Sequence, residues 1–193
     1  MITMASLTKR YNGMTVFQDY SLVIPDGLSF LIGPNGVGKT TLFRCIAGLT
    51  HYAGQITAPS PLVYYPERRD WTDDWDTCDV LQFISEVKGV PLSDRWKAYA
   101  ALLAFDWRQT TRFSHLSKGN RYKCLLLGLL IAPSRVLLMD EPTDGFDLTT
   151  QAAFTALVKD LDIETIVIAT HNATLLAAHP DATIIPLTKV DST

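Results

Sequence analysis

The sequence has 193 residues, of which 47% are hydrophobic, and a formal net charge of −3 at pH 7. This length suits one domain, or one domain with a subdomain, around a large core. The charge balance gives no general surface for polyanions, so we expect no nucleic acid partner. Three cysteines at unrelated spacings, Cys45, Cys78 and Cys124, argue against a disulfide framework and for a reducing compartment. The longest apolar run, residues 124–133, is too short to span a bilayer.

The first third of the chain is predicted to consist mostly of strands. Apolar and polar residues alternate on both sides of Asn12–Gly13, a pair that is typical of hairpin turns. Gly54 and the stretch 59–61, which contains two prolines, mark further turns. We expect, in chain order, strands over 2–8, 14–24 and 28–32, a helix over 40–49 and a strand over 62–65.

Helices dominate the middle of the chain, and strands alternate with helices after it. Val80, Leu81, Ile84 and Val87 recur at helical spacing and share one face. The later alternation implies parallel strands joined by crossover helices. The expected elements are helices over 79–88, 94–105 and 118–132, strand 135–139, helix 149–161, strand 165–169, helix 172–178 and strand 183–187.

A glycine-rich segment between strand 28–32 and the next helix carries the strongest chemical signal. It fits the phosphate-loop pattern G-x-x-x-x-G-K-[ST] in the strand–loop–helix context that this loop requires. Its glycines let successive backbone N–H groups face one anion, and the helix N-terminus adds a positive end. Lys39 supplies a charge for the β- and γ-phosphates, and the Thr40 hydroxyl can ligate Mg²⁺. The candidate binding residues are Gly33, Pro34, Asn35, Gly36, Val37, Gly38, Lys39, Thr40 and Thr41.

Two acidic residues, Asp140 and Glu141, follow the predicted strand 135–139. In an open parallel sheet, the carboxyl end of a buried strand faces the crevice where ligands bind. Asp140 can hold Mg²⁺ through water, and Glu141 can act as a general base on a water near the γ-phosphate. The alternative is a pair of acids that begins a surface loop, and the preceding phosphate loop disfavours it.

Residues 116–120, Leu-Ser-Lys-Gly-Asn, open the predicted helix 118–132. Ser117 and the backbone N–H groups near Gly119 form a candidate second anion site at a helix N-terminus. The alternative is an ordinary serine N-cap, which is the better interpretation of an isolated match.

In combination, these segments resemble the nucleotide-binding subunit of ATP-binding-cassette (ABC) transporters over essentially the whole chain. Five landmarks occur in the family's order. They are the phosphate loop 33–41, residues 116–120 (similar to the signature LSGGQ, with Lys118 and Asn120 as departures), residues 136–141 (similar to the second nucleotide motif), residues 142–147 (similar to the dimer-contact loop P-T-S-G-L-D), and His171, which matches the switch histidine.

The resemblance implies an α/β fold of the P-loop NTPase (RecA-like) type. Such a fold has a mostly parallel core sheet, an antiparallel β subdomain and a helical subdomain. We expect a single ABC ATPase domain over 1–193. Residues of about 1–65 and 133–193 would form the nucleotide-binding core with the β subdomain, and about 66–132 the helical subdomain.

The resemblance also implies a mechanism in two copies. ATP would lie between the phosphate loop of one copy and the signature segment of the other, so Ser117 and Gly119 would complete the site in trans. Glu141 would polarise the attacking water, and His171 would contact the γ-phosphate; these are the expected catalytic residues. Tyr11 matches the family's adenine-stacking aromatic, with a partly buried sheet aromatic as the alternative.

Glu67 departs from the family pattern, which has a glutamine at this place. The resemblance puts it at the Mg²⁺ together with Thr40 and Asp140. The alternative is that Glu67 faces solvent or pairs with Arg68 or Arg69. The interval from Lys39 to Glu67 is also short, so we expect part of the antiparallel subdomain to be trimmed.

We therefore expect an ATPase that uses ATP and Mg²⁺, pairs with itself or a homologous subunit, and drives a membrane permease from the cytoplasmic face. The short chain and the stretch 79–92 resemble the ATPase subunits of small two-component exporters, so we expect an exporter. All four tryptophans fall between residues 71 and 107, beside an acidic run, so the permease is expected to dock around residues 66–107. The alternative is a solvated acidic loop over a subdomain core that contains tryptophan. One alternative is a soluble single-cassette ATPase serving a non-transport assembly. Another is a nucleotide-gated binding module that scarcely hydrolyses ATP, which Glu141 and His171 disfavour.

Overall fold

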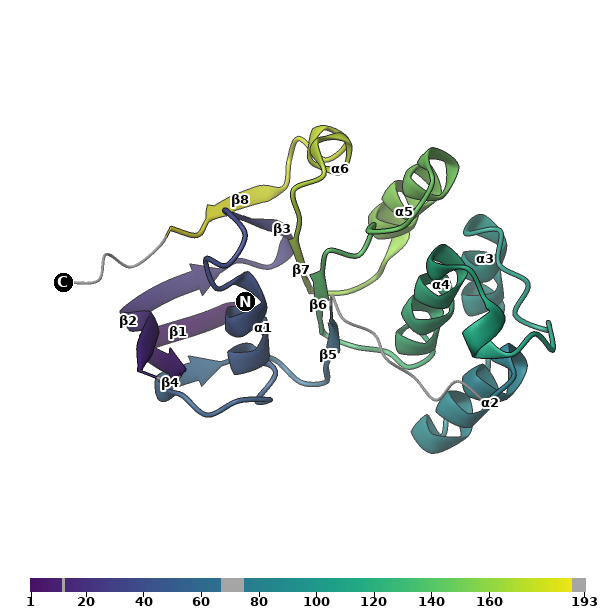
Figure 1. Ribbon diagram of the computed structural model, residues 1–193, viewed down its shortest axis with the longest axis horizontal. Coiled ribbons are helices and arrows are strands. Elements are labelled where there is room, and N and C mark those ends of the chain that lie inside the picture. The colour runs from purple at the N-terminus through teal and green to yellow at the C-terminus, as the bar shows by residue number, and fades with distance from the viewer. Residues whose placement is uncertain (12, 67–74, 189–193) are drawn as a thin grey trace. The chain divides into compact units, whose positions relative to one another are not determined.

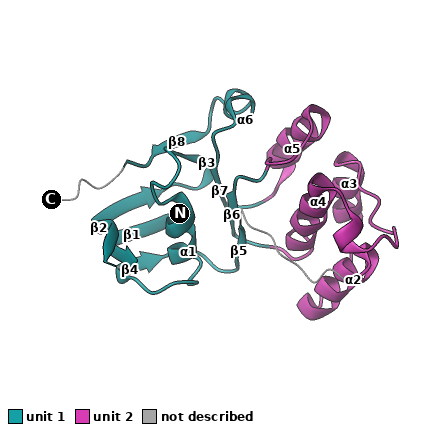
Figure 2. Cartoon of the chain, viewed as in Figure 1, with its two compact units in different colours: residues 1–67, 134–142, 163–193 teal, residues 68–133, 143–162 magenta. Residues whose placement is uncertain are grey.

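The computed structural model describes residues 1–11, 13–66 and 75–188 (Figure 1). The chain divides into two compact units (Figure 2). Unit 1 comprises residues 1–67, 134–142 and 163–193, and unit 2 comprises residues 68–133 and 143–162. Residues 143–162 thus cluster with unit 2, whereas the sequence analysis groups them with the nucleotide-binding core.

A parallel sheet of five strands, in the order β5-β6-β7-β3-β8, forms the centre of unit 1. Every residue of β6 and β7 is buried, as expected of inner strands in a parallel sheet. Asp140 pairs with Ala169, so the carboxyl ends of these two strands meet at one edge. The strands are β3 (Gly27–Ile32), β5 (Leu62–Tyr65), β6 (Val136–Asp140), β7 (Thr165–Ala169) and β8 (Thr183–Pro186), and helix α6 (Ala173–Ala177) precedes β8.

Unit 1 also contains an antiparallel sheet with strand order β2-β1-β4, formed by β1 (Ile2–Tyr11), β2 (Met14–Ile24) and β4 (Ala53–Thr57). Helix α1 (Lys39–Ile46) contacts β4 of this sheet and β6 of the parallel sheet. Its residues Leu42 and Phe43 are fully buried and share one hydrophobic core with Leu7 and Val167. This packing fixes α1, and therefore the end of the phosphate loop, against the sheet.

Strand β4 is a correction to the sequence analysis, which treats Gly54 as a turn. Gly54 lies inside β4 with a φ of +98°, and a Cβ there would clash with the carbonyl oxygens of Ala5 and Ser6. The register between β1 and β4 shifts between Ala5 and Thr8, so glycine serves a bulge in the ladder. Because β4 is mostly exposed, its sequence lacks the apolar alternation by which a strand is recognised.

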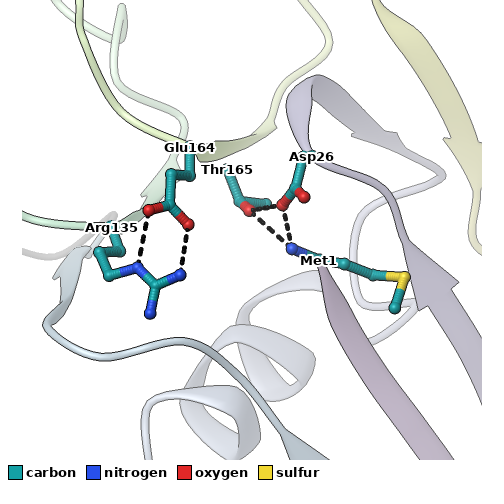
Figure 3. Close-up of polar contacts among 5 residues, drawn as sticks. All are labelled: Met1, Asp26, Arg135, Glu164 and Thr165. Carbon is teal, nitrogen blue, oxygen red and sulfur yellow. Dashed lines mark hydrogen bonds and ion pairs between the residues drawn. The ribbon is translucent and has the colours of Figure 1, made fainter.

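The amino ends of the parallel strands carry a cluster of paired polar groups (Figure 3). Arg135 donates from Nε and Nη2 to the two carboxylate oxygens of Glu164, each at 2.7 Å, and this hydrogen bonding lowers the pKa of Glu164. The Thr165 hydroxyl donates to Oδ1 of Asp26 at 2.7 Å, and the Met1 nitrogen bonds to the same oxygen. These contacts join the starts of β6, β7 and β3.

Unit 2 is built of helices: α2 (Thr77–Lys88), α3 (Asp94–Leu102), α4 (Lys118–Leu129) and α5 (Leu148–Asp160), with a 3₁₀ turn at Phe113–His115. Helix α4 packs against α2 and α3, and α3 contacts α5. Trp96 of α3 is 1% exposed, and its indole Nε1 donates to the carbonyl of Leu127 at 2.7 Å. This bond joins α3 to α4 in the interior of the unit.

The parallel core, the antiparallel sheet and the helical unit confirm the predicted fold class. The predicted helices 40–49, 94–105 and 118–132 are each shorter at their C-termini, ending at Ile46, Leu102 and Leu129. Within residues 1–11, 13–66 and 75–188, none of the helices has both the length and the apolar character that a membrane span needs.

Candidate ATP site

The phosphate loop connects β3 to α1. Gly38 precedes the helix with a φ of 115°, and a Cβ there would lie 2.8 Å from Cγ1 of Val16, so glycine alone suits both the backbone and its neighbour. The Lys39 side chain is largely buried, and its ammonium donates to the carbonyl oxygens of Gly33 at 2.8 Å and Pro34 at 3.3 Å. The cation therefore lies over the loop, where phosphate oxygens are stronger acceptors than carbonyls.

Thr40 and Asp140, which are 100 residues apart, meet in the structure. The Thr40 hydroxyl donates to Oδ2 of Asp140 at 2.6 Å, and the Tyr64 hydroxyl lies 3.4 Å from the same oxygen. Asp140 is 1% exposed. Mg²⁺ is usually held by one or two carboxylates, with waters and substrate phosphates completing its shell. The adjacent hydroxyl and carboxylate oxygens, beside a phosphate loop, fit this donor set.

Glu141 and His171 follow the neighbouring strands β6 and β7. Oε1 of Glu141 lies 2.9 Å from Nδ1 of His171; the glutamate side chain is 12% exposed and the imidazole 80%. Glu141 has a φ of +46°, and its N–H donates to the carbonyl of Ala169 at 2.9 Å. A left-handed backbone at a residue with a Cβ costs about 1–3 kcal/mol and recurs where a side chain must be aimed. The backbone thus holds the Glu141 side chain at the carboxyl ends of the strands, beside His171.

These groups open onto a pocket of about 230 Å³ in unit 1. The pocket combines most of the predicted phosphate-loop residues with the two acids that follow the strand 135–139. Its lining residues are Val16, Asn35, Gly36, Gly38, Lys39, Thr40, Thr41, Asp140 and Glu141.

Five of the predicted residues that the structure describes in unit 1 are not among those that line this pocket: Tyr11, Gly33, Pro34, Val37 and His171. Val37 is 3% exposed and packs into the hydrophobic core, while its backbone N–H donates to the Pro34 carbonyl at 3.3 Å. Tyr11 is 38% exposed on β1 and does not line this pocket as far as the described residues define it. Glu67 lies outside the described residues.

A lysine that the sequence analysis does not single out lies next to Tyr11. The Lys9 ammonium is 4.2 Å from the centroid of the Tyr11 ring and donates to Oγ1 of Thr50 and the carbonyl of His51, both at 2.7 Å. Lys9 is 7% exposed, which is rare for a lysine, and it fixes the tyrosine ring by a cation–π contact. In the sequence, the only sign of this contact is a lysine within a predicted strand, which is weak evidence for a functional role.

A second pocket, of about 300 Å³, lies in unit 2 at the N-terminus of α4. Oγ of Ser117 accepts the N–H of Asn120 at 3.2 Å, so the serine is an N-cap, and it is exposed. Segments 116–120 and 142–147, separate landmarks in the sequence, share this pocket. It is lined by Ser117, Lys118, Gly119, Asn120, Lys123, Gly145, Phe146, Asp147 and Thr150.

Lys123 is the second residue that the sequence analysis misses. It is 8% exposed, and this burial lowers the pKa of its ammonium, an effect that nearby Asp147 opposes. Burial of a lysine is not visible in a sequence, although this one directly precedes the apolar run 124–133. Lys123 and the N-terminus of α4 bring positive charge to the second pocket, which Asp147 offsets in part.

A family model, curated relatives and solved structures all resemble this chain and agree with one another. The family model described as ABC transporter matches residues 17–144. The zinc import ATP-binding protein ZnuC of Jannaschia sp. is 33% identical over 168 residues, which cover 86% of this chain and 69% of that protein. The cytochrome c biogenesis ATP-binding export protein CcmA of Cereibacter sphaeroides is 31% identical over 183 residues, covering 93% of this chain and 83% of that protein.

Solved structures share the fold. The dimeric structure of MJ0796, a bacterial ABC transporter cassette, has a TM-score of 0.80 and 18% identity over 100% of this chain and 97% of that chain. At this identity the likeness shows the fold alone.

Proposed function

The chain belongs to the ABC transporter family, and we propose that it acts as one half of a pair that encloses two ATP molecules. The family's activity is ATP hydrolysis, so the chain is an ATPase. The single observation that carries the proposal is the pocket in unit 1, in which the phosphate loop, the Thr40–Asp140 pair and Glu141 converge.

ATP binding is assigned to the phosphate loop, with its phosphates against Lys39 and the backbone of residues 33–38. Tyr11, braced by Lys9, is the proposed contact for adenine. Thr40 and Asp140 would hold Mg²⁺, which neutralises charge on the phosphates when bound. Glu67 is proposed for the same edge of the site from the sequence pattern alone.

Hydrolysis requires a base that reaches a water beside the γ-phosphate. Glu141 is the proposed base, because its backbone geometry aims the carboxylate at the edge of the pocket. The proposed role of His171 is to position Glu141 and contact the γ-phosphate, and the 2.9 Å approach of its Nδ1 supports the first part. Ser117 and Gly119 are proposed to complete the site of the partner copy.

Family members pair with membrane permeases, and we propose that this chain docks on one from the cytoplasmic side through part of residues 66–107. An exposed apolar group on and before α2 supports this surface: Trp75 is 39% exposed, Phe83 43% and Val87 69%, and the rings of Trp75 and Phe83 are 5.1 Å apart. Trp96 is a correction, because it is buried in the core of unit 2 rather than available to a partner. Trp71 and the acids 70, 73 and 74 lie outside the described residues.

The direction of transport stays a prediction. One relative is named for zinc import and another for export in cytochrome c biogenesis, so the relatives do not favour the expected exporter over an importer. Membrane fractionation tests the wider proposal: a permease subunit follows the membrane pellet, whereas the soluble non-transport alternative stays in the supernatant.

Substitution of Glu141 by Gln tests the catalytic proposal. Loss of a general base should slow ATP turnover by about 10²–10⁴-fold while ATP binding persists. An ATP-bound dimer should then accumulate, and light scattering should detect it. The matched control is Glu164→Gln. Glu164 lies at the amino ends of the parallel strands, away from the pocket, so this variant should hydrolyse ATP at the wild-type rate. A Glu141→Gln protein that hydrolyses ATP at the wild-type rate would refute the assignment.

A further inference from the structure

Two departures from the family motifs meet in unit 2. Lys118 replaces a glycine of the signature pattern, and Asp144 replaces the serine of the dimer-contact pattern. Nζ of Lys118 lies 2.8 Å from Oδ2 of Asp144, and each side chain is 52% exposed. The hydrogen bond to Asp144 raises the pKa of Lys118. The lysine is therefore charged at neutral pH, and two apparently unrelated changes form one ion pair.

The backbone around this pair is closely packed. The Lys118 side chain runs along Gly145, where a Cβ would lie 3.1 Å from Cδ of the lysine. A Cβ at Gly119 would lie 3.0 Å from the Gly145 carbonyl oxygen. Nζ of Lys118 is also 5.4 Å from the centroid of the Tyr122 ring. The ammonium is thus held at the rim of the second pocket, beside Ser117.

The pocket behind this rim points to an anion as its ligand. Lys123 is more than nine-tenths buried and lines the pocket, and the charge of Asp147 acts on its ammonium. Asp147 accepts the Thr150 N–H at 2.7 Å, so one of its oxygens is already engaged in capping α5. A buried ammonium beside the N-terminus of α4 favours a negatively charged group in the pocket.

We propose that Lys118 is an exchangeable cation, held by Asp144 in the separate protomer and transferred to the terminal phosphate of ATP bound by a second copy. Asp144 then sets the ATP concentration at which two copies pair. This inference rests on the proposed function, because it requires Ser117 and Gly119 to face the partner's nucleotide.

The strengths of the two contacts favour exchange. A half-exposed ion pair shifts an equilibrium by roughly one- to fivefold, so Asp144 holds the lysine weakly. A terminal phosphate carries more negative charge than a carboxylate and forms stronger charge-assisted hydrogen bonds. Once Lys118 is removed, the Asp144 carboxylate remains near the incoming phosphate without a counter-charge and repels it.

Variants in a Glu141→Gln background test the inference, with ATP-dependent pairing followed by analytical ultracentrifugation. Asp144→Asn frees the lysine and should lower the ATP concentration for half-maximal pairing about two- to fivefold. Lys118→Met keeps the stem over Gly145 but loses the charge, and should raise that concentration about fivefold or more. The double variant should fall between the two.

The matched control is the other exposed lysine–aspartate pair of unit 2, Lys97 with Asp94 at 3.0 Å. Lys97→Met and Asp94→Asn should leave the ATP concentration for pairing unchanged. Thermal unfolding of the isolated protomer should be the same in all variants, and so should ATP binding at protein concentrations too low for pairing.

The outcomes separate the two proposals. If the background protein pairs with ATP but Asp144→Asn and Lys118→Met both weaken pairing equally, the ion pair is only structural and the inference fails while the function stands. If all variants pair at one ATP concentration, the inference fails in the same way. If the background protein never pairs with ATP, the proposed function fails and the inference with it.

Discussion

Replacing Trp96 by Phe should destabilise unit 2 by an amount that the structure lets us work out. The change removes the 2.7 Å hydrogen bond from the indole to the Leu127 carbonyl. That carbonyl still accepts the N–H of Leu130 at 3.1 Å, so the lost bond costs about 0.5–1.5 kcal/mol. Complete truncation of a buried Trp costs about 3–5 kcal/mol, and we expect the smaller cavity left by Phe to cost about 1–2 kcal/mol. The sum is about 1.5–3.5 kcal/mol.

Thermal unfolding followed by circular dichroism measures this loss. For a chain of this length each kcal/mol lowers Tm by roughly 2–4 °C, so Trp96→Phe should lower it by roughly 3–14 °C. The matched control is Trp75→Phe, whose side chain is 39% exposed and which should change the free energy of unfolding by no more than about 0.5 kcal/mol. Equal shifts in the two variants would refute the assignment of Trp96 to the core and of Trp75 to the surface.

Three further predictions concern the site and the sheet. Gly38→Ala should weaken ATP binding about tenfold or more in calorimetric titration, because its left-handed backbone and a side chain of β2 exclude a Cβ; unchanged affinity would contradict the loop geometry. Thr40→Val, which loses the 2.6 Å bond to Asp140, should weaken the response of ATP binding to Mg²⁺ by roughly 10–100-fold while metal-free binding is kept; an equal response in both proteins would place the metal elsewhere. Finally, the folded-state pKa of Glu164 lies below its ordinary value of 4.5, so its pairing with Arg135 stabilises the protein fully above that value and is lost as pH falls through the lowered pKa. The free energy of unfolding, measured by urea titration, should therefore fall more steeply below about pH 4.5 in the wild type than in Arg135→Met. Parallel plots of this free energy against pH for the two proteins would show that the pair contributes nothing.

The sequence predicts the parallel core well because its inner strands are continuous apolar runs between helices. Strand β4 is not predicted because it is exposed and lacks a run of apolar residues. Its Gly54, which suggests a turn in the sequence, serves a bulge in the structure. The lengths of helices α1, α3 and α4 are overestimated at their C-termini, where apolar residues continue beyond the last helical turn.

The site is predictable where chemistry depends on spacing along the chain. The phosphate loop shows its glycines and Lys39 directly, and the end of a buried strand indicates where Asp140 and Glu141 must lie. Contacts between distant residues are different. The pairing of Lys118 with Asp144 cannot be read from two separate departures from motifs, and the left-handed backbone of Glu141 leaves no mark in the sequence.

The bidentate contact of Arg135 with Glu164 has a practical meaning for protein engineering. It lies where the parallel strands begin, whereas Asp140 is the last residue of β6 and Glu141 follows it. The carboxyl ends of the strands thus carry the catalytic groups, and the amino ends carry contacts that hold the strands together. Because stabilising substitutions most often cost activity when they stiffen a site, the starting edge of the strands is where a more heat-resistant variant can be sought with the ATPase left intact.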